Sequence, residues 1–437
     1  MKTAELRVTE TGGRSATTRH IPPKIALAVG MPATPAPKDW RWSALTDLAR
    51  LESGHTPSRK HPEYWGGTIP WLSIGDARAH DGRRIDDTEE KTNELGIENS
   101  SARVLPENTV CLSRTASVGY VVVMGRPMAT SQDFVNWVCG KQLDPNFLKY
   151  LLIAEDEDLL RFASGSVHQT IYFPEVKAFH ICHPPRAEQQ RIVGLLDEAF
   201  AGLATAKANA EKNLQNARAL FESHLQSVFT QRGPGWVEKP FSELCDIKHG
   251  HAFEGEFFSN EGEYVLLTPG NFYERGGYRD RGEKQKYYTG EIPRDYVLNE
   301  GDLLVAMTEQ AAGLLGSPIL APESDKFLHN QRLGLVTKKP GVAWTNEFFF
   351  HAFNTQPVRK AIHASASGVK VRHTSPTKIG EVVVAFPTSL PEQKRIVTTL
   401  ASLTEETQRL ARLYERKLAA LEALKKSLLH QAFTGQL

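Results

Sequence analysis

The sequence predicts an α+β fold in which two similar domains alternate with two long helices. Three observations lead to this prediction. The second half of the chain repeats the first, each copy ends in a long proline-free stretch with helical periodicity, and short β runs between Gly- and Pro-rich turns precede that stretch. The β runs expected within the domains are 69–74, 109–112, 119–123, 264–268, 302–307, 333–337 and 382–386.

The repeat is strongest where each helical stretch begins. The segment EQQRIVGLLDEAF from Glu188 matches EQKRIVTTLASLT from Glu392, and the same offset continues without a gap to the ends of both stretches. A weaker match pairs 40–55 with 236–251, and we expect each of these to be a short helix entering a domain. The predicted parts are a flexible N-terminal tail (1–37), a first domain (38–185), a linking helix (186–232), a second domain (233–387) and a second long helix (388–437).

The two long helices have matching apolar seams. Apolar residues recur at spacings of three and four from Ile192 to Val228 and from Ile396 to Leu428. A helix of about 44 residues spans about 65 Å, which is more than one small domain can cover. We therefore expect the helices to pair as an antiparallel coiled coil about a pseudo-twofold axis, with the domains at opposite ends. The alternative is two amphipathic helices that each fold on their own domain.

Composition limits the possible function classes. No stretch approaches the roughly 18 apolar residues of a membrane span, so we expect a cytoplasmic protein. The four cysteines lack CxxC spacing and the histidines lack metal-ligand spacing, so neither disulfides nor a metal site are expected. The formal net charge of +1 argues against a strongly basic nucleic-acid-binding protein. However, the stretch 348–380 contains no Asp or Glu and forms a local basic patch.

Motifs of enzymes that act on DNA are missing from the sequence. It has no GxxxxGK[ST] phosphate loop, no glycine-rich nucleotide fingerprint and no Asn/Asp-Pro-Pro-aromatic motif. We therefore expect no catalytic residue and no cofactor in this chain. Two alternatives stay open. One is a stand-alone metal-dependent nuclease that uses Asp246 and Lys248, and the other is a coiled-coil scaffold whose two domains bind other proteins.

Polar loops at equivalent positions of the two copies suit base reading, which needs hydrogen-bonding side chains rather than nucleophiles. Arg can bind guanine through two hydrogen bonds, and Gln or Asn can bind adenine in the same way. A solvent-exposed polar loop would explain any one of these residues, but their recurrence favours binding to double-stranded DNA. The candidates are Arg114, Thr115, Ser117, Gln132, Ser166, His168, Gln169 and Thr170 in the first domain, and Arg275, Arg279, Thr308, Gln310, Asn330, Gln331, Arg332, Lys370, Arg372, His373 and Thr374 in the second.

A doubled motif marks the starts of both helices and the end of the second. It comprises Pro184-Pro185, Glu188-Gln189 and Arg191-Ile192-Val193, then Pro391-Glu392-Gln393, Arg395-Ile396-Val397 and Phe433-Thr434-Gly435. From about residue 40 to 437, the chain thereby resembles the specificity subunit of type I restriction–modification systems. The resemblance implies two target recognition domains that each read one half of a bipartite DNA site, with the paired helices setting the gap.

The resemblance also implies partner subunits that carry out the chemistry. These are two methyltransferase subunits, which bring S-adenosylmethionine for adenine methylation, and two restriction subunits that use ATP and magnesium. Such partners need docking surfaces on the outer faces of the helices. The candidates are polar positions that recur at both helix starts, namely Glu188, Gln189, Arg191, Glu392, Gln393 and Arg395. The alternative for the two glutamates is that they only complement a helix N-terminus.

Overall fold

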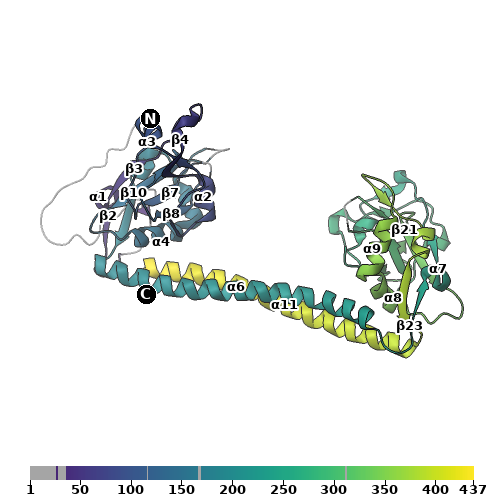
Figure 1. Cartoon of the computed structure of the whole chain (residues 1–437). Helices are drawn as coiled ribbons and strands as arrows, with labels where there is room; N and C mark the ends of the chain where they lie inside the picture. Colours follow the sequence, from purple (N-terminus) through teal and green to yellow (C-terminus); the bar gives the residue numbers. More distant parts are fainter. Residues whose placement is uncertain (1–25, 28–35, 116, 166–168, 311–312) are drawn as a thin grey trace. The chain divides into compact units, whose positions relative to one another are not determined.

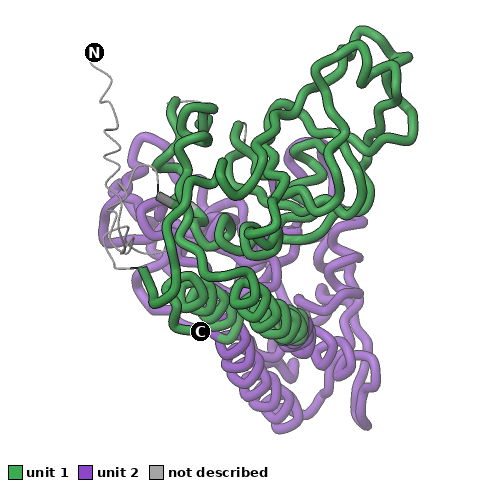
Figure 2. Tube along the Cα trace, turned by 90° about the vertical axis from the view of Figure 1, so that its left-hand side faces the viewer, with its two compact units in different colours: residues 1–210, 417–437 green, residues 211–416 purple. Residues whose placement is uncertain are grey.

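The computed structural model describes residues 26–27, 36–115, 117–165, 169–310 and 313–437 (Figure 1). The chain divides into two compact units (Figure 2). Unit 1 comprises residues 1–210 and 417–437, and unit 2 comprises residues 211–416. Each unit contains one α+β domain together with parts of both long helices, so each can be described by itself.

The long helices are α6 (Arg186–Gln231) and α11 (Leu390–Phe433). In each unit, apolar residues near one end of α6 share a core cluster with residues near the opposite end of α11. These are Ile192, Leu196, Leu429 and Phe433 in unit 1, and Leu225, Phe229, Ile396 and Leu400 in unit 2. The helices therefore pack against each other and run antiparallel within each unit, as predicted, rather than folding separately.

Ion pairs between the two helices fit the same antiparallel alignment. Lys207 Nζ lies 2.6 Å from a Glu422 carboxylate oxygen in unit 1, and Arg218 Nη2 lies 2.7 Å from Glu415 in unit 2. All four side chains are about half exposed. Exposed pairs of this kind contribute about 0–1 kcal/mol. Their main effect is therefore on the alignment of the helices, while the apolar seam supplies most of the stability.

In unit 1 the domain is built on a five-stranded sheet with the order β3-β10-β7-β8-β5. Helix α4 (Pro145–Glu155) contacts strands of this sheet and buries Phe147, Leu148 and Leu151 in the core that also receives α6 and α11. The sheet strands are β3 (Ala49–Ser53), β5 (Arg84–Ile85), β7 (Val110–Ser113), β8 (Val121–Met124) and β10 (Phe134–Cys139). A three-stranded sheet consists of β4 (Trp65–Leu72), β6 (Lys91–Thr92) and β9 (Ala129–Thr130).

Unit 2 repeats this plan with different lengths. Its main sheet has the order β13-β21-β17-β19, and a second sheet has the order β14-β16-β15-β20. The main strands are β13 (Cys245–His249), β17 (Leu303–Ala306), β19 (Pro318–Leu320) and β21 (Leu333–Lys338). The second sheet consists of β14 (Phe258–Ser259), β15 (Tyr264–Leu266), β16 (Tyr287–Tyr288) and β20 (Phe327–Leu328). Helices α8 (Asn346–Phe353), α9 (Gln356–Ser365) and α10 (Pro376–Gly380) complete the domain.

The two segments expected to be short entry helices are mainly strands, so that prediction is wrong. In unit 1 the chain runs through β2 (Arg41–Ala44), one helical turn α1 (Leu45–Leu48) and then β3. Unit 2 has the same order in β12 (Trp236–Pro240), α7 (Phe241–Leu244) and β13. Strand β2 pairs with β11 (His180–His183), and β12 pairs with β23 (Val383–Pro387). These pairings provide hydrogen-bond partners for the main-chain groups of β2 and β12. Tertiary pairing therefore overrides the local helical pattern.

The predicted flexible tail contains one ordered strand. Ala26–Leu27 forms β1, which pairs in parallel with β11, and the Leu27 side chain is fully buried in the core of unit 1. The expectation of a tail without structure is therefore wrong at these residues, while 1–25 and 28–35 lie outside the described residues. Within the described chain, no helix is both long and apolar enough to cross a membrane. The division into domains at 185 and 387 stays a prediction.

Candidate nucleic-acid interface

Main-chain hydrogen bonds bring the three predicted loops of the first domain together. The N–H of Arg114 donates to the carbonyl of Asp133 at 2.8 Å, and the N–H of Ile171 donates to the carbonyl of Arg114 at 2.9 Å. Ser164 and Thr170 form an antiparallel bridge that closes the third loop. The structure thus gathers residues 113–115 and 117, residues 131–133, and residues 164, 165, 169 and 170 into one surface. Ser166 and His168 lie outside the described residues.

Arg114 is used within this surface to brace the loops. Its Nη2 donates to the carbonyl of Gln132 at 3.1 Å, and its guanidinium lies 4.9 Å from the centre of the Phe173 ring. Burial lowers the pKa of this guanidinium, although Asp133 opposes the shift. Arg114 is therefore better placed to position the neighbouring loops than to reach a base by itself.

The remaining predicted residues of the first domain differ in exposure. Gln132 and Gln169 are exposed, whereas Thr115 and Thr170 are half-buried. Thr115 Oγ1 lies 3.3 Å from Asp133 Oδ1, and the hydroxyl of Thr56 donates to the side-chain oxygen of Gln132. Thr56 was not predicted from the sequence. The exposed glutamines are the best candidates for base contacts in this domain.

A close approach explains a glycine that recurs in both copies. A Cβ at Gly54 would lie 1.9 Å from the carbonyl oxygen of Ser131, and one at Gly250 would lie 2.2 Å from that of Asn330. Only glycine lets the chain that leaves β3 and β13 pass so near the second predicted loop of each domain. The repeated Gly-His pair at 54–55 and 250–251 is the sequence signal that could have identified this junction.

The second domain uses the same framework. The N–H of Met307 donates to the carbonyl of Arg332 at 3.0 Å, and the N–H of Thr374 donates to that of Met307 at 2.9 Å. Strands β18 (Thr308–Glu309) and β22 (Arg372–His373) pair directly. The three predicted loops of this domain are thus brought together as well.

Burial separates the predicted residues of the second domain into two groups. Thr308, Asn330 and Thr374 are 8%, 7% and 8% exposed, so a direct base contact by these side chains is not supported. Asn330 Oδ1 instead accepts a hydrogen bond from the N–H of Arg332, which fixes the turn. The exposed group, which can meet DNA without rearrangement, comprises Gln310, Gln331, Arg332, Lys370 and His373.

Arg372 belongs to neither group, because its guanidinium is already engaged. It donates to the carbonyl of His363 at 2.5 Å and lies 3.5 Å from a Glu309 carboxylate oxygen. Arg359 of the acid-free stretch is also turned inward, and burial lowers its pKa to about 10. The local basic patch is therefore smaller than the sequence suggested.

A fourth loop of the second domain carries the predicted arginines Arg275 and Arg279, which are both exposed. The N–H of Arg279 donates to the carbonyl of Asn271 at 2.7 Å, and the N–H of Gly277 donates to that of Pro318 at 2.9 Å. The second bond ties this loop to the first residue of β19. Both side chains are therefore exposed on a loop that is tied to the rest of the domain.

Equivalent capping boxes stabilise the segment after β4 and after β15. Ser73 and Asp76 exchange side-chain and main-chain hydrogen bonds, and Thr268 and Asn271 do the same. Asp76 is 7% exposed and Asn271 is 1% exposed. The polar group at each position therefore serves the fold. Sequence reasoning missed this pair because Gly-Asp and Gly-Asn are common turn dipeptides.

The start of each long helix holds a buried glutamine that clamps the helix to its domain. Gln189 Oε1 accepts the N–H of Asp144 at 2.8 Å, and its Nε2 donates to the carbonyls of Gln142 and Pro184, both at 2.9 Å. Gln393 accepts the N–H of Thr345 at 3.0 Å. Its Nε2 donates to the carbonyls of Ala343 and Pro387 at 2.9 and 3.0 Å.

Both glutamine side chains are 0% exposed. The expectation that Gln189 and Gln393 face outward for partner docking is therefore wrong. The reason is geometric, because each lies one turn before the apolar residues Ile192 and Ile396 on the same face of its helix.

The charged residues beside the glutamines stay on the surface. Glu188 and Arg191 form a two-bond ion pair at 2.7 and 2.8 Å, and Glu392 and Arg395 form an identical pair. The hydrogen bond from each arginine lowers the pKa of its glutamate. Arg191 also donates to the carbonyl of Leu437 at 2.7 Å. These four residues are accessible to a partner, while their contribution to stability is small.

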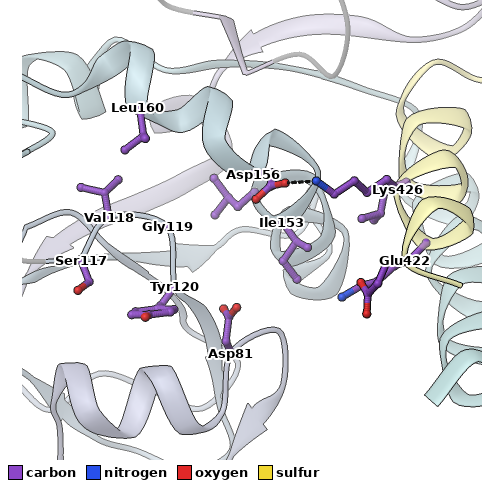
Figure 3. Close-up of a pocket in the computed structure, with 13 residues that line it drawn as sticks. Asp81, Ser117, Val118, Gly119, Tyr120, Ile153, Asp156, Leu160, Glu422 and Lys426 are labelled. Carbon is purple, nitrogen blue, oxygen red and sulfur yellow. Dashed lines mark hydrogen bonds and ion pairs between the residues drawn. The ribbon is translucent and has the colours of Figure 1, made fainter. Parts of the chain in front are cut away.

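A cleft in unit 1 separates the first domain from α11 (Figure 3). Its volume is about 390 Å³, and its walls include the predicted residue Ser117, Tyr120 and Ile153 on the domain side. On the helix side, Lys426 Nζ lies 2.9 Å from the Asp156 carboxylate, as the dashed line in Figure 3 indicates.

The residues considered for a nuclease do not form a catalytic cluster among the described side chains. Asp246 is 75% exposed and lies 3.6 Å from Lys339 Nζ, while Lys248 donates to the carbonyl of Asp295. In the described part of the chain, no group of three or more His, Cys, Asp and Glu side chains could hold a metal ion.

Comparison with known proteins gives consistent matches. A family model described as the type I restriction modification DNA specificity domain matches residues 37–214 and 234–416. The chain is 32% identical over 162 residues to the MjaIX specificity subunit of Methanocaldococcus jannaschii, which covers 37% of this chain and 38% of that relative. It is 26% identical over 236 residues to the EcoBI specificity subunit of Escherichia coli, which covers 54% and 44%. The matched parts thus span less than half the length of each of these relatives.

Solved structures agree in fold. The HsdS subunit from Thermoanaerobacter tengcongensis has a TM-score of 0.61 at 18% identity, covering 93% of this chain and 99% of that one. A chain from a study of assembly and conformational transition of the type I R-M system has a TM-score of 0.72 at 19% identity, covering 92% and 100%. Because the family model matches both domains and most of the chain, this protein belongs to the family of type I restriction–modification DNA specificity subunits.

Proposed function

We propose that this chain is the recognition subunit of a type I restriction–modification complex and reads a bipartite double-stranded DNA target, one half-site with each domain. The observation that supports this most is the shared loop framework. The same main-chain hydrogen bonds gather three loops in both domains, whereas the exposed side chains on those loops differ. A common frame with different reading residues suits two different half-sites.

Within this proposal, the base-reading residues are the exposed ones. Arg and the amide side chains can each form two hydrogen bonds with a base edge in the major groove. Arg275 and Arg279 contact phosphates, which adds affinity without sequence preference. The proposed base-reading set is Gln132 and Gln169 in the first domain, and Gln310, Gln331, Arg332, Lys370 and His373 in the second.

The chain itself is proposed to be non-catalytic. Two methyltransferase subunits would supply S-adenosylmethionine and methylate adenine, and two restriction subunits would use ATP and magnesium, all in the cytoplasm. Glu188, Arg191, Glu392 and Arg395 are the proposed docking residues, since they form matching exposed ion pairs at equivalent helix positions. The protein-partner alternative for the two domains does not explain why amide and guanidinium groups concentrate on their loops.

Mapping of methylated adenines in a host genome, with and without this gene, tests the proposal. The expected result is a split motif of two short blocks separated by a fixed gap, present only when the gene is present. A continuous motif, or an unchanged methylation pattern after deletion of the gene, would contradict the proposed function.

A further inference from the structure

A buried carboxylate lies at the centre of the reading loops of the second domain. Glu309 is 2% exposed and ends strand β18. One of its oxygens, Oε2, accepts the main-chain N–H groups of Gly313, Leu314 and Leu315 at 2.9, 2.9 and 3.1 Å. Three such bonds to one oxygen hold the 313–315 segment against β18. Glu309 was passed over in the sequence, where it stands between the predicted residues Thr308 and Gln310.

The other oxygen faces Arg372 and His363. Glu309 Oε1 lies 3.5 Å from Arg372 Nη1 and 3.7 Å from His363 Nδ1. Burial lowers the pKa of His363, which favours the neutral imidazole, and the guanidinium of Arg372 supplies a positive charge. A carboxylate this deeply buried needs both hydrogen bonds and a counter-charge. Arg372 supplies the charge and also donates to the carbonyl of His363 at 2.5 Å.

The ion pair joins two strands that end at reading residues. Glu309 pairs with Arg372 in the β18–β22 ladder, and Thr308 pairs with His373. Gln310 follows Glu309 directly, and His373 follows Arg372 directly, and both of these side chains are exposed. The position of each exposed side chain thus depends on a neighbour that is locked in the Glu309–Arg372 pair.

In the first domain, the loop at the position equivalent to Thr308–Leu315 is shorter. There the N–H of Gly119 closes the loop on the carbonyl of Ser113, whereas in the second domain Gly316 closes it on Ala306. The loop of the second domain is thus longer by four positions. The extra length needs its own support, and the carboxylate of Glu309 supplies it through the bonds to 313–315.

We propose that Glu309, held by Arg372, is a positioning residue on which base discrimination by the second domain depends. This inference rests on the proposed function. The pair fixes Gln310 and His373 relative to each other, and base discrimination by hydrogen bonds depends on such placement to within tenths of an ångström. Arg372 acts through Glu309 and not through a base, which revises its expected role in DNA binding.

The test uses the whole complex, co-expressed with its methyltransferase partner in a host without adenine methylation of its own. Methylated adenines are mapped genome-wide for wild type, Glu309→Gln, Arg372→Ala and Arg372→Lys. A matched control is Glu323→Gln, which removes a carboxylate from an exposed ion pair of the same domain. We expect Glu309→Gln and Arg372→Ala to lower discrimination about tenfold at positions of one half-site, which is within the range that a base contact supplies.

The other half-site should keep wild-type discrimination in every variant, because Glu309 lies in the second domain only. Arg372→Lys keeps the charge and should be intermediate, and Glu323→Gln should match wild type. If Glu309→Gln gives no methylation at all, the result for Arg372→Lys decides. Relaxed discrimination by Arg372→Lys at one half-site supports the proposal, and wild-type discrimination by this variant overturns it. Wild-type fidelity in both Glu309→Gln and Arg372→Ala also overturns it. A continuous wild-type motif would instead overturn the proposed function.

Discussion

Gln189 and Gln393 illustrate how the structure changes the meaning of single residues. The sequence marks them as polar positions of a repeated motif, and polar residues at a helix start are commonly exposed. Their helical spacing from Ile192 and Ile396 places them on the buried face, and an amide can satisfy donors and acceptors of the main chain at once. Spacing was therefore the better guide, and residue type alone was misleading.

Replacement of either glutamine by alanine should weaken the junction between domain and helix. Gln189→Ala leaves one N–H and two carbonyls without their partner, and each buried group left unpaired costs about 1–3 kcal/mol. We expect a loss of at least about 2 kcal/mol in the free energy of unfolding, measured by urea titration. Gln190→Ala, at the exposed neighbour, is the control and should change stability by less than about 0.5 kcal/mol. Equal stability of both variants would refute the clamp.

The long helices are the elements that sequence predicts best. Their seams repeat over many turns without proline, so the periodic signal accumulates, and α6 and α11 lie where it indicated. The seven expected β runs all contain strand residues of the structure. Strand β10 was not predicted from the sequence, although it lies between β3 and β7. Its first four residues are all buried, so no alternation of buried and exposed positions marks it.

The loops proposed to read DNA could be located from the sequence, but the orientation of their side chains could not. Loop positions follow from the repeat, so the right segments were identified. Whether Thr308 or Gln310 faces solvent depends on the pairing of β18 with β22, which joins residues more than 60 positions apart. Such pairing leaves no local pattern in the sequence. The burial of Glu309 and the inward orientation of the predicted residue Arg372 could not be foreseen for this reason.

The end of α4 should make the stability of unit 1 depend on pH. Glu155 is 2% exposed, and burial raises its pKa to about 7 despite its ion pair with Arg161. In the unfolded chain a glutamate has a pKa of about 4.3. The folded state therefore binds more protons between these values, and its stability falls as pH rises from about 4.3 to 7, by up to about 4 kcal/mol.

Unfolding free energies at pH 5 and pH 8 test this expectation. Glu155→Gln should remove most of the decrease in unfolding free energy, because a buried neutral amide does not become charged when pH rises. Glu198→Gln, at an exposed position of α6, should keep the wild-type decrease. The same pH dependence in Glu155→Gln and wild type would show that the buried carboxyl is not its source.

At the scale of the whole molecule, the repeat predicts that the two domains read DNA independently. Substitution of Gln132 should alter only one half of the target, and substitution of Gln331 or Arg332 only the other. Each lost two-bond base contact costs about 1–3 kcal/mol of discrimination. Mapping of methylated adenines for Gln132→Ala and Gln331→Ala would reveal which half-site changes. A change in both halves from one substitution would contradict independent reading.

The glutamine clamps have a consequence for how such proteins change over time. Four of the hydrogen bonds of Gln189 and Gln393 that reach into the domains join main-chain groups of 142–144 and 343–345, which any sequence can offer. A foreign domain with the same chain path could therefore be grafted onto the helix without redesign of the joint. Recombination between genes would then produce new target preferences in one event, while the helices and their partners stay as they were.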